Sequence, residues 1–181
     1  MLLFPASAGA QCSLQPGSDC TGADLHGQDL TGANLTGSVF INANLSGANL
    51  TNAQIGGSIL QGANLSGANL TGAQLAGSVL QSANLSGATL SNASMFGSIF
   101  ASANLSGATA SSALAYGDDF SGADLSNANL AGADLHGSVL NANLTNANLS
   151  GADVHGAILN GATLAGANFS GANNTGCIGC P

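Results

Sequence analysis

Apolar side chains recur at every fifth position over almost the whole chain. From Leu25 to Leu105 each of these positions holds Leu, Ile, Met or Phe, and the residue two places earlier is most often Ala. A period of five matches neither the 3.6 residues of a helical turn nor the alternation of a flat strand. Gly and Asn, which favour turns, are frequent two residues after the apolar position. The pattern predicts a chain that turns a corner every five residues and points its Leu and Ala side chains inward.

A longer period of twenty residues lies over the first. The motifs Gly37-Ser38-Val39-Phe40 and Gly57-Ser58-Ile59-Leu60 recur as Gly77-Ser78-Val79-Leu80 and Gly97-Ser98-Ile99-Phe100. Four five-residue sides therefore complete one coil, and successive coils stack as parallel strands about 4.8 Å apart. This predicts an all-β, four-sided solenoid of about eight coils. We place it at residues 21–176, after a loop or cap over 11–20 and before a tail over 177–181.

Units such as Ala43-Asn44-Leu45-Ser46-Gly47 and Ala83-Asn84-Leu85-Ser86-Gly87 resemble the motif of the pentapeptide-repeat family. The resemblance covers about residues 21–176 and implies a right-handed, four-sided parallel β-helix. It says much less about function, because the family includes many members of unknown role. One group within the family consists of DNA mimics that protect gyrase.

Two irregularities interrupt the pattern. Ala110 and Ala115 occupy consecutive Leu sites. Because lost core side chains are costly, we expect a local bulge or irregular turn in which Leu114 or Tyr116 turns inward. After Leu140 one unit is a residue short. A single missing corner residue should leave the stacking intact.

The outward positions divide into polar sides and one apolar side. Rows such as Asn44, Asn64, Asn84 and Asn104 predict amide ladders along the stack. On the fourth side the outward row is Val39, Ile59, Val79, Ile99, Asp119, Val139 and Ile158. This row, called here the Val/Ile column, is either a surface for self-association or a partner protein, or simply a row of residues that suit parallel strands.

Charge excludes several classes of partner. The chain has no Lys or Arg, its eight acidic residues are all Asp, and its formal net charge is −8. A surface that meets nucleic acid or an anionic membrane needs basic residues, so we expect neither partner. No apolar run is long enough to span a bilayer.

The ends of the chain point to export. Residues 1–10 end in the small residues Ala8-Gly9-Ala10, which is typical of the remnant of a signal peptide; a disordered or cap-packing segment is the alternative. Cys12 and Cys20 would close a short disulfide loop in an exported chain, and Cys177 and Cys180 form either a terminal disulfide or free thiols rather than a redox centre. We expect a periplasmic, lumenal or extracellular protein, with the cytoplasm as the alternative.

No residue pattern indicates catalysis or a cofactor. The Ser and Thr residues take turn positions, without an acid and His placed to activate them. A weak metal-site candidate is Asp134, His136, Asp153 and His155, which fall on one side of adjacent coils. The sequence favours a non-enzymatic structural or interaction module, exported and self-associating as a dimer or filament. DNA mimicry and ice binding are the alternatives.

Overall fold

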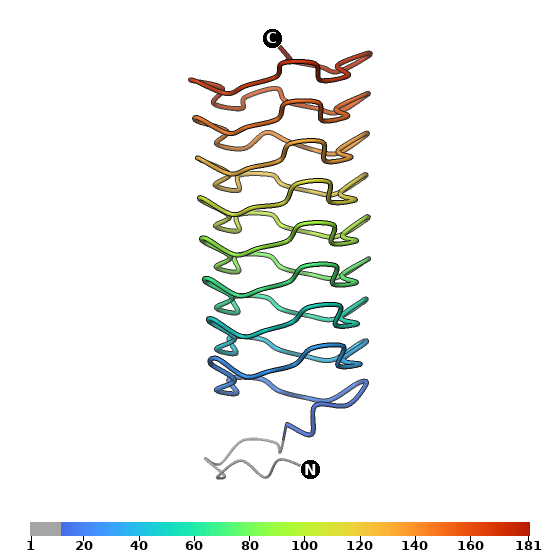
Figure 1. Cartoon of the computed structure of the whole chain (residues 1–181), viewed down its shortest axis with the longest axis vertical. Coiled ribbons are helices and arrows are strands. Elements are labelled where there is room, and N and C mark those ends of the chain that lie inside the picture. Colours follow the sequence, from blue (N-terminus) through green and yellow to red (C-terminus); the bar gives the residue numbers. More distant parts are fainter. Residues whose placement is uncertain (1–11) are drawn as a thin grey trace.

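The chain winds into a right-handed, four-sided parallel β-helix, seen as a regular stack of coils in Figure 1. The computed structural model describes residues 12–181, so the expected signal remnant over 1–10 lies outside the described residues. Within 12–181 there is no helix, and the sheets consist of isolated parallel bridges of one residue each. The bridges begin with Asp19↔Val39 and end with Ile158↔Ile178. The fold predicted from the periods of five and twenty is therefore confirmed.

Apart from the shortened corner after Leu140, the corners of the stack are tight turns that contain a left-handed residue. In the turn from Cys20 to Ala23, the Ala23 N–H donates to the Cys20 carbonyl at 3.0 Å. Gly22 lies between them with φ +65°, a value that Gly adopts without steric cost. Asn and Ser take the same place at some other corners, for example Ser102 with φ 59°. The Gly and Asn residues of the sequence pattern thus mark the corners.

The core is a continuous column of inward Leu, Phe and Ala side chains. Leu45, Leu65, Leu85 and the stacked rings of Phe100 and Phe120 are almost fully buried, as are most of the Ala residues two positions before the apolar site. Backbone N–H groups donate to the neighbouring coil at regular intervals, as from Leu45 to Asn64 at 2.7 Å. Apolar burial and a repeated backbone ladder together hold the coils in register.

A ladder of buried Ser residues runs along one inner corner. Ser38, Ser58, Ser78, Ser98 and Ser138 are at most 1 % exposed. Each hydroxyl donates to a carbonyl 23 residues earlier, as from Ser78 to Ile55 at 2.8 Å. Several of them also accept the backbone N–H of the ladder residue in the preceding coil, as Ser98 does from Ser78.

Asp118 replaces Ser in this ladder. Its Oδ1 accepts the Ser98 N–H at 2.8 Å, while Oδ2 is buried and has no hydrogen-bond partner. Burial raises the pKa of the Asp118 carboxyl to about 8, against the opposing effect of backbone N–H donors at Ser98 and Gly97. This acid therefore binds a proton over much of the neutral pH range.

The expected bulge near Ala110 and Ala115 does not form. Both Ala side chains point inward and are buried, and the bridges Thr109↔Asn129 and Leu114↔Asp134 keep the regular register. Leu114 is 45 % exposed, and Tyr116 lies on the outside between two other rings. Because neighbouring residues alternate between the two faces of a strand, turning Leu114 inward would break the backbone register. The prediction of an inward Leu114 or Tyr116 was wrong.

The short unit after Leu140 behaves as expected. The spacing of the bridges falls from twenty to nineteen residues, as in Asp124↔Asn143, and then returns to twenty, as in Asn143↔Thr163. A close contact from the Ala142 N–H to the Leu140 carbonyl, at 2.8 Å, makes the shortened corner. Over residues 12–181 no helix is long and apolar enough to cross a membrane.

Candidate interaction surface

The Val/Ile column lies in register on the outside of the fourth side. Parallel bridges join Val39, Ile59, Val79 and Ile99 in sequence, and then Asp119, Val139, Ile158 and Ile178. Ile59, Ile99 and Ile158 are exposed by 36 to 39 %. Asp119 interrupts the column, and its carboxylate accepts the Ser121 N–H at 2.9 Å and the Ser121 hydroxyl. The longest unbroken apolar stretch is therefore Val39 to Ile99.

The corner before the Val/Ile column changes character along the stack. It holds Gly56-Gly57 and Ala76-Gly77 beside Ile59 and Val79. No large side chain therefore projects from the corner next to these two residues. One coil further on, the same corner position holds Phe96, followed by Tyr116 and His136. The small residues leave the Ile59 and Val79 side chains accessible to a flat partner surface.

Phe96, Tyr116 and His136 form an aromatic ridge on the outside of this corner. The ring centroids of Phe96 and Tyr116 are 5.0 Å apart, as are those of Tyr116 and His136, and the rings are within 9° of parallel. Leu114 lies in the neighbouring outward row, which is polar elsewhere. That row contains Asn34, Gln54, Gln74, Ser94, Asp134, Asp153 and Asn173. This surface was not predicted from the sequence, although the spacing of twenty between positions 96, 116 and 136 indicates it.

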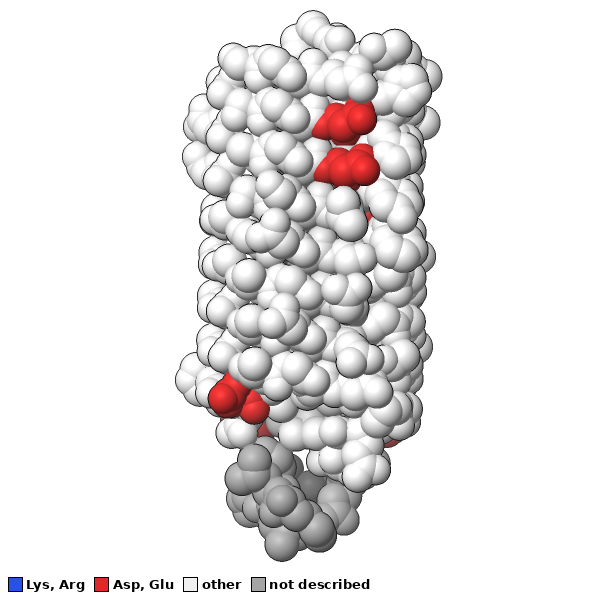
Figure 2. All heavy atoms as spheres, turned by 45° about the vertical axis from the view of Figure 1, so that its right-hand side comes forward, with Lys and Arg blue, Asp and Glu red and all other residues white. Residues whose placement is uncertain are grey.

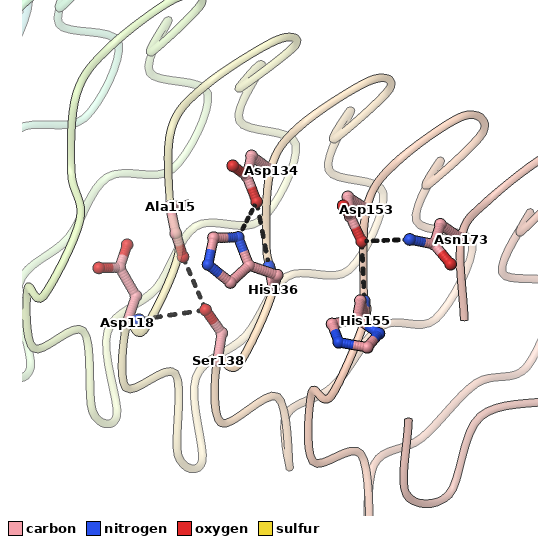
Figure 3. Close-up of polar contacts among 8 residues, drawn as sticks. All are labelled: Ala115, Asp118, Asp134, His136, Ser138, Asp153, His155 and Asn173. Carbon is pink, nitrogen blue, oxygen red and sulfur yellow. Dashed lines mark hydrogen bonds and ion pairs between the residues drawn. The ribbon is translucent and has the colours of Figure 1, made fainter. Parts of the chain in front are cut away.

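The four residues of the metal-site candidate lie on adjacent coils but do not converge (Figure 3). Asp134 accepts from His136 Nδ1 at 2.6 Å, while Asp153 accepts from Asn173 at 3.0 Å and from the His155 N–H at 2.9 Å. Within residues 12–181 no three His, Cys, Asp or Glu side chains are close enough to hold a metal ion. Each carboxylate instead binds its own neighbours.

Charge is sparse on the molecule. Figure 2 shows a face that is almost uncharged, with acidic groups at a few separate places and no Lys or Arg. Asp19 and Asp29 lie near the N-terminal end, and hydrogen bonds from Thr21 and Thr31 lower the pKa values of their carboxyl groups. Asp134 and Asp153 stack on neighbouring coils further along. The acids do not form a continuous row.

The remaining sides carry the predicted amide ladders. Asn84 donates to Asn64 at 3.3 Å, and Asn64 donates to Asn44 at 3.4 Å. Each of these Asn oxygens also accepts an N–H two residues later, as Asn44 does from Ser46 at 3.2 Å. The amides are thus used within the stack, which confirms their structural interpretation.

The four cysteines form two pairs, one at each end of the stack. The sulfur atoms of Cys12 and Cys20 lie at disulfide-bonding distance, and so do those of Cys177 and Cys180. Cys20 is buried at the base of the core. The fold therefore accommodates the expected Cys12–Cys20 pairing and, for Cys177 and Cys180, the disulfide rather than the free-thiol alternative.

Comparisons with known proteins agree with the geometry. The family model for pentapeptide repeats matches in eight copies, over residues 18–57, 48–87, 58–97, 73–109, 98–141 and 140–173. No curated protein sequence matches the chain.

Solved structures with this repeat also match. HetL, a pentapeptide repeat protein involved in heterocyst differentiation regulation from the cyanobacterium Nostoc sp. strain PCC 7120, is 30% identical over 90% of this chain and 87% of its own, with a TM-score of 0.32. QnrB1, a plasmid-mediated fluoroquinolone resistance protein, is 23% identical over 86% of this chain and 88% of its own, with a TM-score of 0.54, and supports the fold alone. With the repeat model covering most of its length, the chain belongs to the pentapeptide repeat family.

Proposed function

We propose that the protein is a non-enzymatic interaction module, a rigid rod that pairs with a second copy through the Val/Ile column. The observation that carries this proposal is the unbroken outward row from Val39 to Ile99, in which the corners beside Ile59 and Val79 hold only Gly and Ala. Exposed, contiguous apolar rows of this kind are typical of protein interfaces.

The available area is sufficient for a stable dimer. The chain exposes 7394 Å², so one of four sides offers at most about a quarter of that, roughly 1,850 Å². A standard interface buries about 800 Å² on each partner, which is less than half of one side. Two flat, parallel-stranded sides can approach closely, and β-branched side chains lose little rotamer entropy on burial.

We further propose that the protein works in an oxidising compartment: the periplasm, an organelle lumen or the extracellular space. Two cysteine pairs at bonding distance and a short apolar N-terminal stretch support this. Fractionation of cells expressing the tagged protein, with its N-terminus sequenced after purification, tests the localisation. Recovery in the cytoplasm with residues 1–10 retained would contradict it.

DNA mimicry has less support than self-association. DNA carries one charge per about 1.7 Å, so a rod of roughly 38 Å would need on the order of twenty negative charges. This chain has eight acidic residues, and one of them, Asp118, is buried with a raised pKa. The acids lie in separate groups rather than in a row.

The test is the molar mass in solution, measured by size-exclusion chromatography with multi-angle light scattering. We expect the unmodified protein to be a dimer in both oxidising and reducing buffer, and the Ile59→Asn/Val79→Asn variant to be a monomer. A matched control, Gln54→Asn/Gln74→Asn, puts the same residue type on the third side of the same coils and should remain a dimer. A monomeric unmodified protein, or a variant that still dimerises, would refute the proposal.

A further inference from the structure

A second exposed apolar surface lies on the third side and its corner, away from the Ile59 and Val79 positions. It consists of Leu114 and the aromatic ridge residues Phe96 and Tyr116, followed along the stack by Asp134 and Asp153; we call it the Leu114 surface. Leu114 is bridged to Asp134, and Asp134 is bridged to Asp153, so the three lie in one outward row on successive coils. An apolar group is thus followed by two carboxylates along one line.

The fold does not require an apolar residue at position 114. The other members of its row are polar, and Leu114 remains 45 % exposed although Ala110 and Ala115 beside it leave the core two Leu side chains short. Phe96 is 39 % exposed. Leaving these side chains in water costs free energy that burial against a partner would recover.

The aromatic side chains of this surface already pack against one another. The Phe96, Tyr116 and His136 rings stack on one another at 5.0 Å, and the Asp134 carboxylate holds the His136 ring through a hydrogen bond of 2.6 Å. Binding here would therefore lose little side-chain entropy, which is a common source of interface affinity.

The charges identify the kind of partner. Asp134 and Asp153 stack on adjacent coils; Asp134 bonds to His136, which is charged only when protonated, and the sequence contains no Lys or Arg. A second copy of the chain therefore cannot supply a permanent positive charge to these carboxylates. Coils are spaced by about 4.8 Å, so the two acids lie about 5 and about 10 Å from the Leu114 position along the row.

We propose that the Leu114 surface binds a basic segment of another protein, with an aliphatic or aromatic side chain on Leu114, Phe96 and Tyr116 and Lys or Arg on Asp134 and Asp153. An extended segment advances about 3.3 Å per residue, so the basic residue on Asp134 follows the apolar one by one or two positions and the basic residue on Asp153 follows it by about three. The basic residues of this segment would lie on the third side, whereas the proposed pairing is tested at Ile59 and Val79 on the fourth side.

The test uses a random twelve-residue peptide library displayed on phage and selected on the immobilised full-length protein. We expect enriched peptides to carry an apolar residue followed by Lys or Arg at the stated spacing. A synthetic, fluorescently labelled copy of the most enriched peptide is then titrated by anisotropy. Affinity should fall when salt is raised from about 0.1 M to about 1 M.

Three variants assign the binding to this surface. Leu114→Asn and Asp134→Asn/Asp153→Asn should each lower the affinity for the synthetic peptide by about tenfold or more. Asp24→Asn/Asp29→Asn removes the same amount of charge at the other end of the rod and should leave the affinity unchanged. Circular dichroism of each variant checks that the fold is retained.

The outcomes are distinct from those of the dimer test. No enrichment, enrichment of acidic or uncharged peptides, or equal weakening by the Asp24→Asn/Asp29→Asn control would overturn the proposal. It would also be overturned if Leu114→Asn abolished dimerisation in light scattering, because a second copy would then occupy this surface. Loss of the dimer in Ile59→Asn/Val79→Asn with peptide binding retained would support both proposals.

Discussion

Replacing Asp118 with Ser should stabilise the protein in a manner that depends on pH. Ser occupies the equivalent buried position in the coils before and after it, where its hydroxyl both donates and accepts. The ionised Asp118 carboxylate can only accept, and its Oδ2 has no partner. The chain contains no Lys or Arg to compensate the buried charge.

The size of the effect follows from the difference between the native and unfolded pKa values of this carboxyl. Burial raises the pKa of Asp118 from 3.8 to about 8, and each tenfold change in proton affinity corresponds to about 1.4 kcal/mol. Between these two values the native state holds a proton that the unfolded state has lost, so the free energy of unfolding falls as pH rises. The reduction in the free energy of unfolding that Asp118 causes is absent below about pH 4. It reaches about 4 kcal/mol at pH 7 and is of order 5 kcal/mol above pH 8.

Guanidinium unfolding followed by circular dichroism at about pH 5, 7 and 9 measures this effect. We expect the unmodified protein to lose stability across the series, and Asp118→Ser and Asp118→Asn to lose much less. Asp119→Ser, which removes the neighbouring carboxylate on the outer surface, should keep the slope of the unmodified protein. Parallel pH dependences of the unmodified protein and Asp118→Ser would show that the buried carboxyl does not control stability.

Four further predictions concern the core, the corners, the cysteines and the net charge. Leu125→Ala should cost about 2–5 kcal/mol of unfolding free energy because the side chain is buried, whereas Leu114→Asn on the outside should change it by less than about 0.5 kcal/mol; denaturant titration measures both. Ser102→Gly should stabilise the protein by up to about 1 kcal/mol because φ at this corner is positive, and a lower denaturation midpoint would contradict this. Cys12→Ser/Cys20→Ser should cost about 2–3 kcal/mol by releasing a short loop, and a thiol assay on the unmodified native protein should detect no free thiol. Lowering the pH towards the sequence pI of about 4.1 should increase light scattering as the net charge approaches zero, and flat scattering would show that charge does not keep the rods apart.

The overall fold could be predicted from the sequence because its rules are local and repeat. Each unit places one Leu inward and one turn residue at a corner, and the recurrence of Gly-Ser-Val/Ile after twenty residues defines the coil. The amide ladders followed in the same way, since identical residues twenty apart must lie next to each other. Even the missing residue after Leu140 had the expected consequence, because a corner can shorten without displacing the bridges.

The predicted bulge at Ala110 and Ala115 was wrong, because keeping the backbone register outweighs refilling the two small core sites. Two missing Leu side chains at Ala110 and Ala115 were expected to draw Leu114 or Tyr116 inward, but the bridges on both sides of this coil hold the backbone in place. Leu114 therefore stays outside. A coil bonded to two neighbours cannot rotate one residue without losing several hydrogen bonds.

The surfaces that carry the proposals were only partly visible in the sequence. The Val/Ile column was identified, since its members share one place in the repeat. The aromatic ridge was missed, because Phe96, Tyr116 and His136 differ in type and meet only when coils are stacked. Asp118 was missed for a similar reason. That this carboxyl is buried becomes clear only when its position is compared with the buried Ser residues at the same place in the other coils. Aligning the sequence in rows of twenty would reveal both.

Pairing of two rods along their fourth sides can be tested most directly by small-angle X-ray scattering of the full chain. Side-by-side pairing predicts a doubled molar mass, an almost unchanged maximum dimension and a larger cross-sectional radius of gyration than the Ile59→Asn/Val79→Asn variant shows. A doubled mass with a doubled maximum dimension would mean end-to-end association. That result, or a single rod at every concentration, would contradict pairing through the Val/Ile column.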